Sequence, residues 1–141
     1  MRNGDRPVRV ERLVFFTDAA VAIAMTLLVL PLMEGVSEAG AAGDNAVGYL
    51  SANADALFGF VLSFVIVARF WRAHHRLFEH VEYDVAGVFW LNMGWLLAIV
   101  FLPVATAMTA VFAEGAAQYL VYIATILACS LGLTAMVLVY R

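Results

Sequence analysis

The sequence contains no lysine, a single cysteine and few charged residues. Charged residues make up 13% of its 141 residues, against about 25% in a typical soluble domain. The lone Cys129 excludes a disulfide or a cysteine metal site within one chain, and we expect it to pack inside a helix bundle. Basic clusters typical of nucleic-acid binding are absent. Hydrolase, kinase and zinc-protease motifs are absent too, so we predict no enzyme activity, no metal site and no cofactor.

Apolar residues, in contrast, are abundant and lie in long runs. They make up 65% of the chain, and four runs reach the roughly 20 residues that a helix needs to cross a bilayer. The runs show no alternation of apolar and polar residues, which argues against barrel strands. We therefore predict an all-α membrane protein with a single transmembrane domain over 1–141, and helices at about 13–33, 49–70, 85–108 and 116–140.

The loops between these helices differ in composition and charge. Pro31 predicts the end of the first helix, and the Gly, Ala and acidic residues of 34–45 predict a flexible loop. Arginine precedes the first run, ends the second and follows the fourth, whereas the other two loops are acidic. Because basic residues stay in the cytoplasm, both ends are predicted to be cytoplasmic. The basic residues are Arg2, Arg6, Arg9, Arg12, Arg69, Arg72, Arg76 and Arg141.

Asp18 is a carboxylate inside the first apolar run. Such a residue costs about 2.5–3.5 kcal/mol at the centre of a membrane helix and is expected to be paired or to face water. It is either a structural hydrogen-bonding group near the cytoplasmic end or part of a proton or cation relay. Its candidate partners are Arg12, Trp71, His74 and His75.

A stripe of the first helix combines apolar residues with one hydroxyl. Ile23, Thr26, Leu27 and Leu30 recur at spacings of three and four, which places them on one face of a helix. Such a face either packs in a bundle or lines a pore. In a packed face, the Thr26 hydroxyl is expected to bond to the carbonyl of Ala22. Asp18 points about 140° away from Ile23 at 100° per residue, so we expect it to face other helices.

Two further patterns are weaker. His74, His75 and His80 could bind a metal or sense pH, but adjacent histidines point in different directions on a helix, so we favour anchoring at the lipid headgroups. The tripeptide 47–49 (VGY) is similar to the core of the potassium-filter sequence, whose carbonyl groups replace ion hydration. Its flanking residues do not fit that sequence, and we reject a filter there.

Three segments together resemble the transmembrane protein 175 family, which comprises the lysosomal potassium channel and its prokaryotic relatives. The first is 12–18 (RLVFFTD), similar to the family signature R-x-x-x-F-S-D, with Thr17 in place of serine. The second is 70–78 (FWRAHHRLF), similar to its Trp-x-x-His-His turn. The third comprises Leu91-Asn92 and Leu102-Pro103. The resemblance covers roughly the first three helices.

The resemblance implies a cation channel without a carbonyl filter, in which the first helices of a homotetramer surround a pore that conducts potassium. By position, Ile23, Leu27 and Leu30 match the apolar constriction, and Thr26 matches a hydroxyl layer that favours potassium. It also implies an inner membrane of a prokaryotic cell and two further helices in each subunit. The cytoplasmic network that holds the pore helix would comprise Arg12, Phe16, Thr17, Asp18, Trp71 and His74.

Other functions stay open at this point. A small proton-coupled transporter would use Asp18 as the carboxylate that exchanges a proton for substrate. A shortened relative of the channel would be a structural or partner-binding bundle without conduction. Asp55, near the outer end of the second helix, departs from the family pattern and is expected to face the outer vestibule or a neighbouring loop.

Overall fold

The computed structural model describes residues 6–79, 86–112 and 115–140, and these residues form helices without any strand. Four stretches of helix are long and apolar enough to span a membrane, which confirms the predicted all-α membrane bundle. The helices are α1 (Arg6–Leu27), α2 (Leu30–Ala42), α3 (Ala46–Ala52), α4 (Ala54–Phe78), α5 (Ala86–Val111) and α6 (Ala116–Val139).

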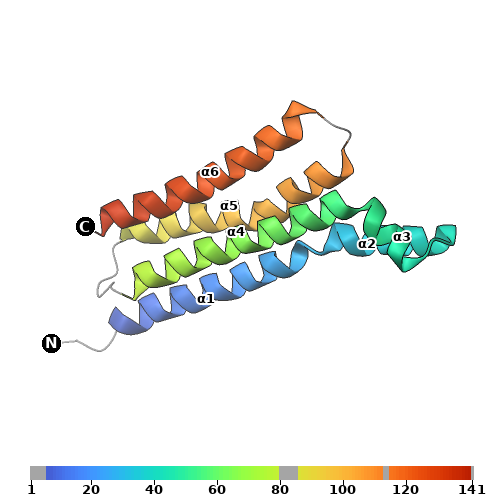
Figure 1. Cartoon of the computed structure of the whole chain (residues 1–141). Coiled ribbons are helices and arrows are strands. Elements are labelled where there is room, and N and C mark those ends of the chain that lie inside the picture. The colour runs from blue at the N-terminus through green and yellow to red at the C-terminus, as the bar shows by residue number, and fades with distance from the viewer. Residues whose placement is uncertain (1–5, 80–85, 113–114, 141) are drawn as a thin grey trace.

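Four of the helices form the body of the molecule. In Figure 1, α1, α4, α5 and α6 lie side by side and alternate in direction, so α1 begins and α6 ends at the same end of the bundle. Helix α5 packs against the other three, and its buried Trp95, Ile99 and Leu102 form the centre of the core. Cys129 of α6 is buried in the same core, as predicted.

The two ends of the bundle carry opposite charges. We call the end with the start of α1 and the end of α4 the basic end, because it carries Arg12, Arg69, Arg72 and Arg76. We call the other the acidic end, because it carries Glu34, Glu38, Asp44 and Asp55. Helices α2 and α3 extend from the bundle at the acidic end (Figure 1).

The first membrane helix is interrupted earlier than predicted. Helix α1 ends at Leu27, and Pro31 lies inside the first turn of α2 instead of ending a helix. The physical reason is that proline has no N–H for the carbonyl of Leu27, whereas the first turn of a new helix needs no such donor. The backbone therefore breaks at Leu28–Val29 and continues as a second helix.

The prediction of a flexible loop over 34–45 was wrong. Helix α2 continues to Ala42 and ends at Gly43, whose φ of 83° is the left-handed conformation that glycine adopts readily. Asn45 then caps α3, because its side-chain oxygen accepts a hydrogen bond from the N–H of Gly48 at 2.9 Å. Alanine and glutamate are both strong helix formers, and together they outweigh the glycines of this segment. The acidic charges, which suggested a loop, belong in α2 to these same glutamates.

The other predicted helices shift at their ends. Helix α4 begins at Ala54 rather than 49 and extends to Phe78, eight residues past the predicted end at 70. Its charged last turns lie outside the apolar run from which the end was predicted. Helices α5 and α6 begin and end within three residues of their predicted bounds, and α5 continues through Pro103.

Candidate functional site: an exposed stripe on α1 and its buried support

The residues predicted to line a pore form an exposed stripe on α1 and the first residue of α2. Ile23 is 60% exposed, Leu27 37% and Leu30 46%, and Thr26 is exposed between them. The opposite face of α1 is packed into the core through Val21 and Ala24, and Leu28, directly after the helix, is buried in the same core. We call Ile23, Thr26, Leu27 and Leu30 the α1 stripe. Within one copy of the chain it is not a packing face, so bundle packing does not explain its pattern.

The hydroxyl of Thr26 bonds within its own helix. It donates to the carbonyl oxygen of Ile23 at 2.7 Å, three residues back, and not to that of Ala22 as predicted. Helix α1 ends one residue later, and last turns commonly tighten to spacings of three. Because the proton is used inside the helix, the Thr26 oxygen presents its lone pairs outward. An outward oxygen among apolar side chains is a weak ligand for a cation.

Behind the stripe, three fully buried polar side chains join three helices near the basic end. Asn92 of α5 donates through Nδ2 to Thr17 Oγ1 of α1 at 2.9 Å. Its other amide atom, Oδ1, lies 2.6 Å from Nε2 of His74 of α4. None of the three is exposed. We call Thr17, His74 and Asn92 the buried triad. It fixes the position of α1 against α4 and α5 through directional bonds in an apolar surrounding, where such bonds are strong.

The hydrogen bonds of Asn92 also define the tautomer of His74. Since the amide nitrogen donates to Thr17, the amide oxygen accepts, so neutral His74 carries its proton on Nε2. The His74 ring stacks on Trp95 with centroids 4.5 Å apart and 13° between the planes. Its Nδ1 atom is buried without a hydrogen-bond partner among the described residues. The triad thus uses one of the two ring nitrogens.

The structure separates the histidines as their spacing predicts. His74 points into the core. His75 lies against Trp71, with ring centroids 5.6 Å apart, and its Nε2 atom lies 3.7 Å from Oε1 of Glu79. For His74 the prediction of headgroup anchoring was wrong, because the side chain is fully buried. His80 lies outside the described residues. Within 6–79, 86–112 and 115–140, no three His, Cys, Asp or Glu side chains lie close enough together to hold a metal.

Asp18 pairs with one of its predicted partners. Trp71 Nε1 of α4 donates to Asp18 Oδ1 at 2.8 Å, next to the buried triad. Of the residues predicted to support the pore helix, Thr17 and His74 bond to Asn92, and Asp18 bonds to Trp71. Arg12 and Phe16 are exposed. Sequence reasoning missed Asn92 as the central residue. Its signal was an amide in the middle of an apolar run, which needs partners inside the bundle.

A second polar cluster, also missed, joins α4, α5 and α6 in the half of the bundle nearer the acidic end. The hydroxyl of Thr106 lies 2.9 Å from both Ser63 Oγ and the carbonyl oxygen of Leu102. Ser63 Oγ in turn lies 3.0 Å from the Tyr122 hydroxyl. We call Ser63, Thr106 and Tyr122 the hydroxyl cluster. Single hydroxyl residues spread over three sequence segments gave no signal that they would meet.

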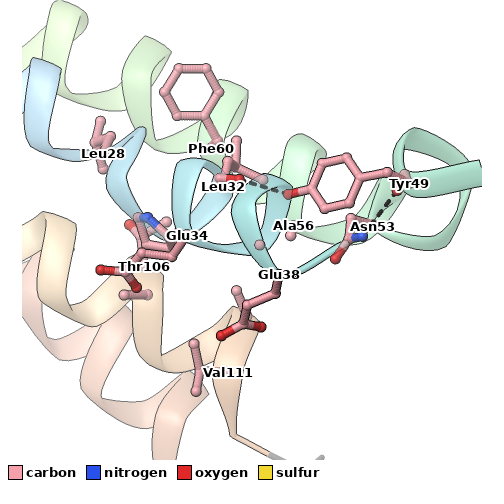
Figure 2. A pocket seen from close by; sticks show the side chains of 14 residues that line it. Leu28, Leu32, Glu34, Glu38, Tyr49, Asn53, Ala56, Phe60, Thr106 and Val111 are labelled. Atoms are coloured by element: carbon pink, nitrogen blue, oxygen red, sulfur yellow. Dashed lines mark hydrogen bonds between the residues drawn. The ribbon is translucent and has the colours of Figure 1, made fainter. Parts of the chain in front are cut away.

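A cavity of about 340 Å³ lies at the acidic end, with walls from α2, α3, α4 and α5. Figure 2 shows Glu38 extending from α2 toward Val111 of α5, and Tyr49 of α3 reaching toward Leu32 of α2; all four residues line this space. Residues 47–49, similar in sequence to a filter core, lie inside helix α3. Their carbonyl groups face along a helix and cannot form a ring around an ion, which agrees with the rejection of a filter there.

Comparison with known proteins decides the family. The sequence model of the family described as endosomal/lysosomal potassium channel TMEM175 matches residues 12–103. This is more than half of the chain, and it contains the α1 stripe and the buried triad. The chain belongs to the TMEM175 family. This confirms the resemblance found in the three sequence segments. The match extends from Arg12, at the start of the signature in α1, to Pro103 in α5, so α6 lies outside the matched residues.

Individual relatives carry channel names. The chain is 31% identical over 97 residues to a potassium channel of Chryseobacterium sp. (strain P1-3), covering 67% of this chain and 46% of that protein. It is 30% identical over 95 residues to a potassium channel of Streptomyces collinus, covering 67% and 45%. It is 29% identical over 104 residues to the human endosomal/lysosomal proton channel TMEM175, covering 74% and 20%.

These alignments also define how much of a TMEM175 relative the chain represents. It spans less than half of the bacterial channels and a fifth of the human protein. No solved structure matches the chain. The relatives named above are ion channels rather than enzymes, and the four candidate spans make this chain an integral membrane protein.

Proposed function

We propose that the chain is a subunit of a potassium-permeable cation channel in which several copies, in a homotetramer, surround a pore lined by the α1 stripe. The observation that carries the proposal is that α1 is anchored on one face by the core and the buried triad, while its other face exposes Ile23 and Leu27, followed by exposed Leu30 at the start of α2. The bacterial relatives named as potassium channels support the choice of ion.

In this channel the narrowest point is apolar. A ring of Ile23 side chains offers no ligand to a cation, so the ion must keep its water or lose it without replacement, and the barrier depends on how readily water fills the ring. Thr26, one turn further on, presents an oxygen that partly compensates for lost hydration. We therefore expect slow conduction and a modest preference for potassium over sodium, without a carbonyl filter.

The charges at the two ends support an orientation in a prokaryotic inner membrane. The basic end, with Arg12 and the three arginines of α4, faces the cytoplasm, because arginine resists translocation. The acidic end then faces outward, so its carboxylates attract cations toward the outer mouth. The start of α1 and the end of α6 lie at the same end of the bundle (Figure 1), so this orientation puts both of them on the cytoplasmic side.

The test replaces Ile23 with asparagine in the full chain reconstituted into liposomes. An amide ring is wetted easily, so potassium flux should rise by about tenfold or more, equivalent to a barrier lower by about 1.4 kcal/mol. The matched control is Ile123→Asn on α6, because Ile123 is exposed to the same degree, 61% against 60%. Equal flux for the wild type and Ile23→Asn, or a rise in the control alone, contradicts the proposal.

The role of Thr26 has its own test. Thr26→Ala should lower the permeability ratio of potassium to sodium by about two- to tenfold, since one oxygen ligand with a net contribution of about 0.5–1.5 kcal/mol is lost. Thr134→Ala is the control, because Thr134 is also exposed and bonds to a carbonyl of its own helix, that of Ser130. Reversal potentials under bi-ionic conditions give the ratio, and an unchanged ratio in Thr26→Ala contradicts the assignment.

The alternative of a proton-coupled transporter makes a different prediction for Asp18. Such a carboxylate is expected to face a substrate cavity, whereas Asp18 bonds to Trp71 and is not among the residues that line the cavity at the acidic end. In the channel, Asp18→Asn should weaken assembly more than it alters ion preference. Loss of proton-driven uptake with intact assembly would favour the transporter.

A further inference from the structure

Helix α2 continues the pore-lining helix but packs poorly. It has no buried residue, and it follows the backbone break at Leu28–Val29. The hydrogen bonds across that break are long or belong to turns, such as 3.4 Å from the N–H of Val29 to the carbonyl oxygen of Thr26. Leu30, the outermost member of the α1 stripe, is the first residue of α2. Its position therefore depends on how α2 is oriented.

Tyr49 of α3 holds α2 on one side. Its hydroxyl donates to the carbonyl oxygen of Leu32 at 2.7 Å, across 17 residues of sequence. Figure 2 shows this bond reaching from the Tyr49 ring to α2. Gly35 makes the approach possible, because a Cβ atom there would lie 2.8 Å from the Tyr49 hydroxyl oxygen. Tyr49 itself is buried, and Asn53 donates to its backbone carbonyl oxygen at 2.9 Å, which stabilises the end of α3 from which the ring extends.

Helix α2 faces the cavity of about 340 Å³, whose other walls come from Tyr49, from α4 and from α5. The volume of this space is comparable to that of several side chains and far larger than that of the gaps in a close-packed interior. Leu30 is not among the residues that line it. A rotation of α2 about Leu28–Val29 into this space would turn the helix toward α5. Because Leu30 is the first residue of α2, its side chain would change direction relative to Ile23 and Leu27.

We propose that Tyr49 is a positioning residue for the outer part of the pore lining: its bond to Leu32 keeps Leu30 in line with Ile23, and the cavity gives α2 room to rotate when that bond opens. The proposal rests on the pore-lining function proposed above. It makes the outer ring adjustable while the Ile23 ring stays fixed by the buried triad. Opening the bond widens the path at Leu30.

The first test is Tyr49→Phe, which removes the hydroxyl and keeps the ring. Spin labels at Val36→Cys on α2 and Phe112→Cys after α5, both exposed in the wild type, report the distance across the cavity. The background carries Cys129→Ala, and labelled chains are diluted with unlabelled ones so that pairs lie within one copy. Tyr49→Phe should add a population at shorter distance and raise potassium flux about two- to tenfold, as expected for loss of one hydrogen bond.

Two controls separate this effect from a general loss of structure. Tyr119→Phe removes the hydroxyl of an exposed tyrosine on α6 and should change neither distance nor flux. Ala107→Leu fills part of the cavity from α5 and, combined with Tyr49→Phe, should restore the wild-type distance and flux. Ala128→Leu on the exposed face of α6 adds the same volume outside the cavity and should restore neither.

The two readouts distinguish this inference from the proposed function. If Tyr49→Phe leaves the distance unchanged, Tyr49 does not hold α2 and the inference fails. If the distance shifts but flux stays at the level of a conducting wild type, α2 moves without affecting the pore, and the positioning role fails while the channel stands. If Ile23→Asn also fails to alter flux, the pore assignment itself fails, whatever the distance shows.

Discussion

The basic and acidic ends of the same bundle are built in opposite ways. At the basic end, Thr17, His74 and Asn92 are fully buried and bonded to one another across three helices. At the acidic end, α2 has no buried residue and faces a cavity, with a tyrosine hydroxyl bonding to its backbone. Helices α1 and α2, which are joined at Leu28–Val29, therefore belong to differently held ends of the bundle.

The difference shows how one helix can have a fixed part and an adjustable part. Directional bonds inside an apolar core have few alternative arrangements, so the buried triad defines a single position for α1. A helix held at its surface by a bond to one carbonyl oxygen can exchange between positions at a small free-energy cost. The proposed constriction at Ile23 lies with the fixed part, and Leu30 lies with the adjustable part.

The largest difference between the two ends is expected when an asparagine side chain is removed from each. Asn92→Ala leaves the His74 donor unpaired in the core and should lower the free energy of unfolding by about 2–3 kcal/mol. Asn53→Ala removes a bond to the Tyr49 carbonyl oxygen in a half-buried position and should cost about 0.5–1 kcal/mol. Denaturation in detergent measures both, and equal losses would show that the ends are equally rigid.

A smaller effect is expected when adjacent histidines are replaced by phenylalanine. His74→Phe keeps a ring against Trp95 but removes the Nε2 donor to Asn92, at a cost of about 1–2 kcal/mol. His75→Phe changes a half-exposed ring near Glu79 and should lie within about 0.5 kcal/mol of the wild type. The same denaturation experiment compares them. A larger loss for His75→Phe would contradict the assignment of His74 to the buried triad.

The smallest effect tests the hydroxyl cluster, which joins α4, α5 and α6 without reaching α2. Tyr122→Phe removes one partner of Ser63, and such bonds between membrane helices contribute about 0.6 kcal/mol on average. Tyr119→Phe should cost nothing measurable. Spin-label distances between α2 and α5 should be unaffected by Tyr122→Phe. A shift in that distance would mean that the hydroxyl cluster, and not Tyr49, controls α2.

The number of spans and the direction of Asp18 could be predicted from sequence because both follow from simple regularities. Apolar run length fixes the membrane helices, and helical periodicity separates Asp18 from Ile23 by about 140°. The exposure of the stripe and the Asp18–Trp71 bond agree with that geometry. The stripe's function could not be settled in this way, since periodicity describes a lumen-facing and a lipid-facing helix equally well.

The missed features depend on tertiary contacts or on competition between local effects. Asn92 and Thr17 are 75 residues apart, and no spacing rule pairs them. The end of α1 was misplaced because Pro31 can either end a helix or begin one, and the break two residues earlier allowed the second outcome. The composition of 34–45 suggested a loop, yet its alanines continued α2 to Ala42.

The most direct test of the central claim asks whether Ile23 faces the same residue in other copies of the chain. In a Cys129→Ala background, Ile23→Cys in membranes should form disulfide-linked dimers under mild oxidation, because side chains around a narrow axis approach one another. Ile123→Cys, equally exposed on α6, should stay monomeric. Monomeric Ile23→Cys together with cross-linked Ile123→Cys would contradict a pore lined by the α1 stripe.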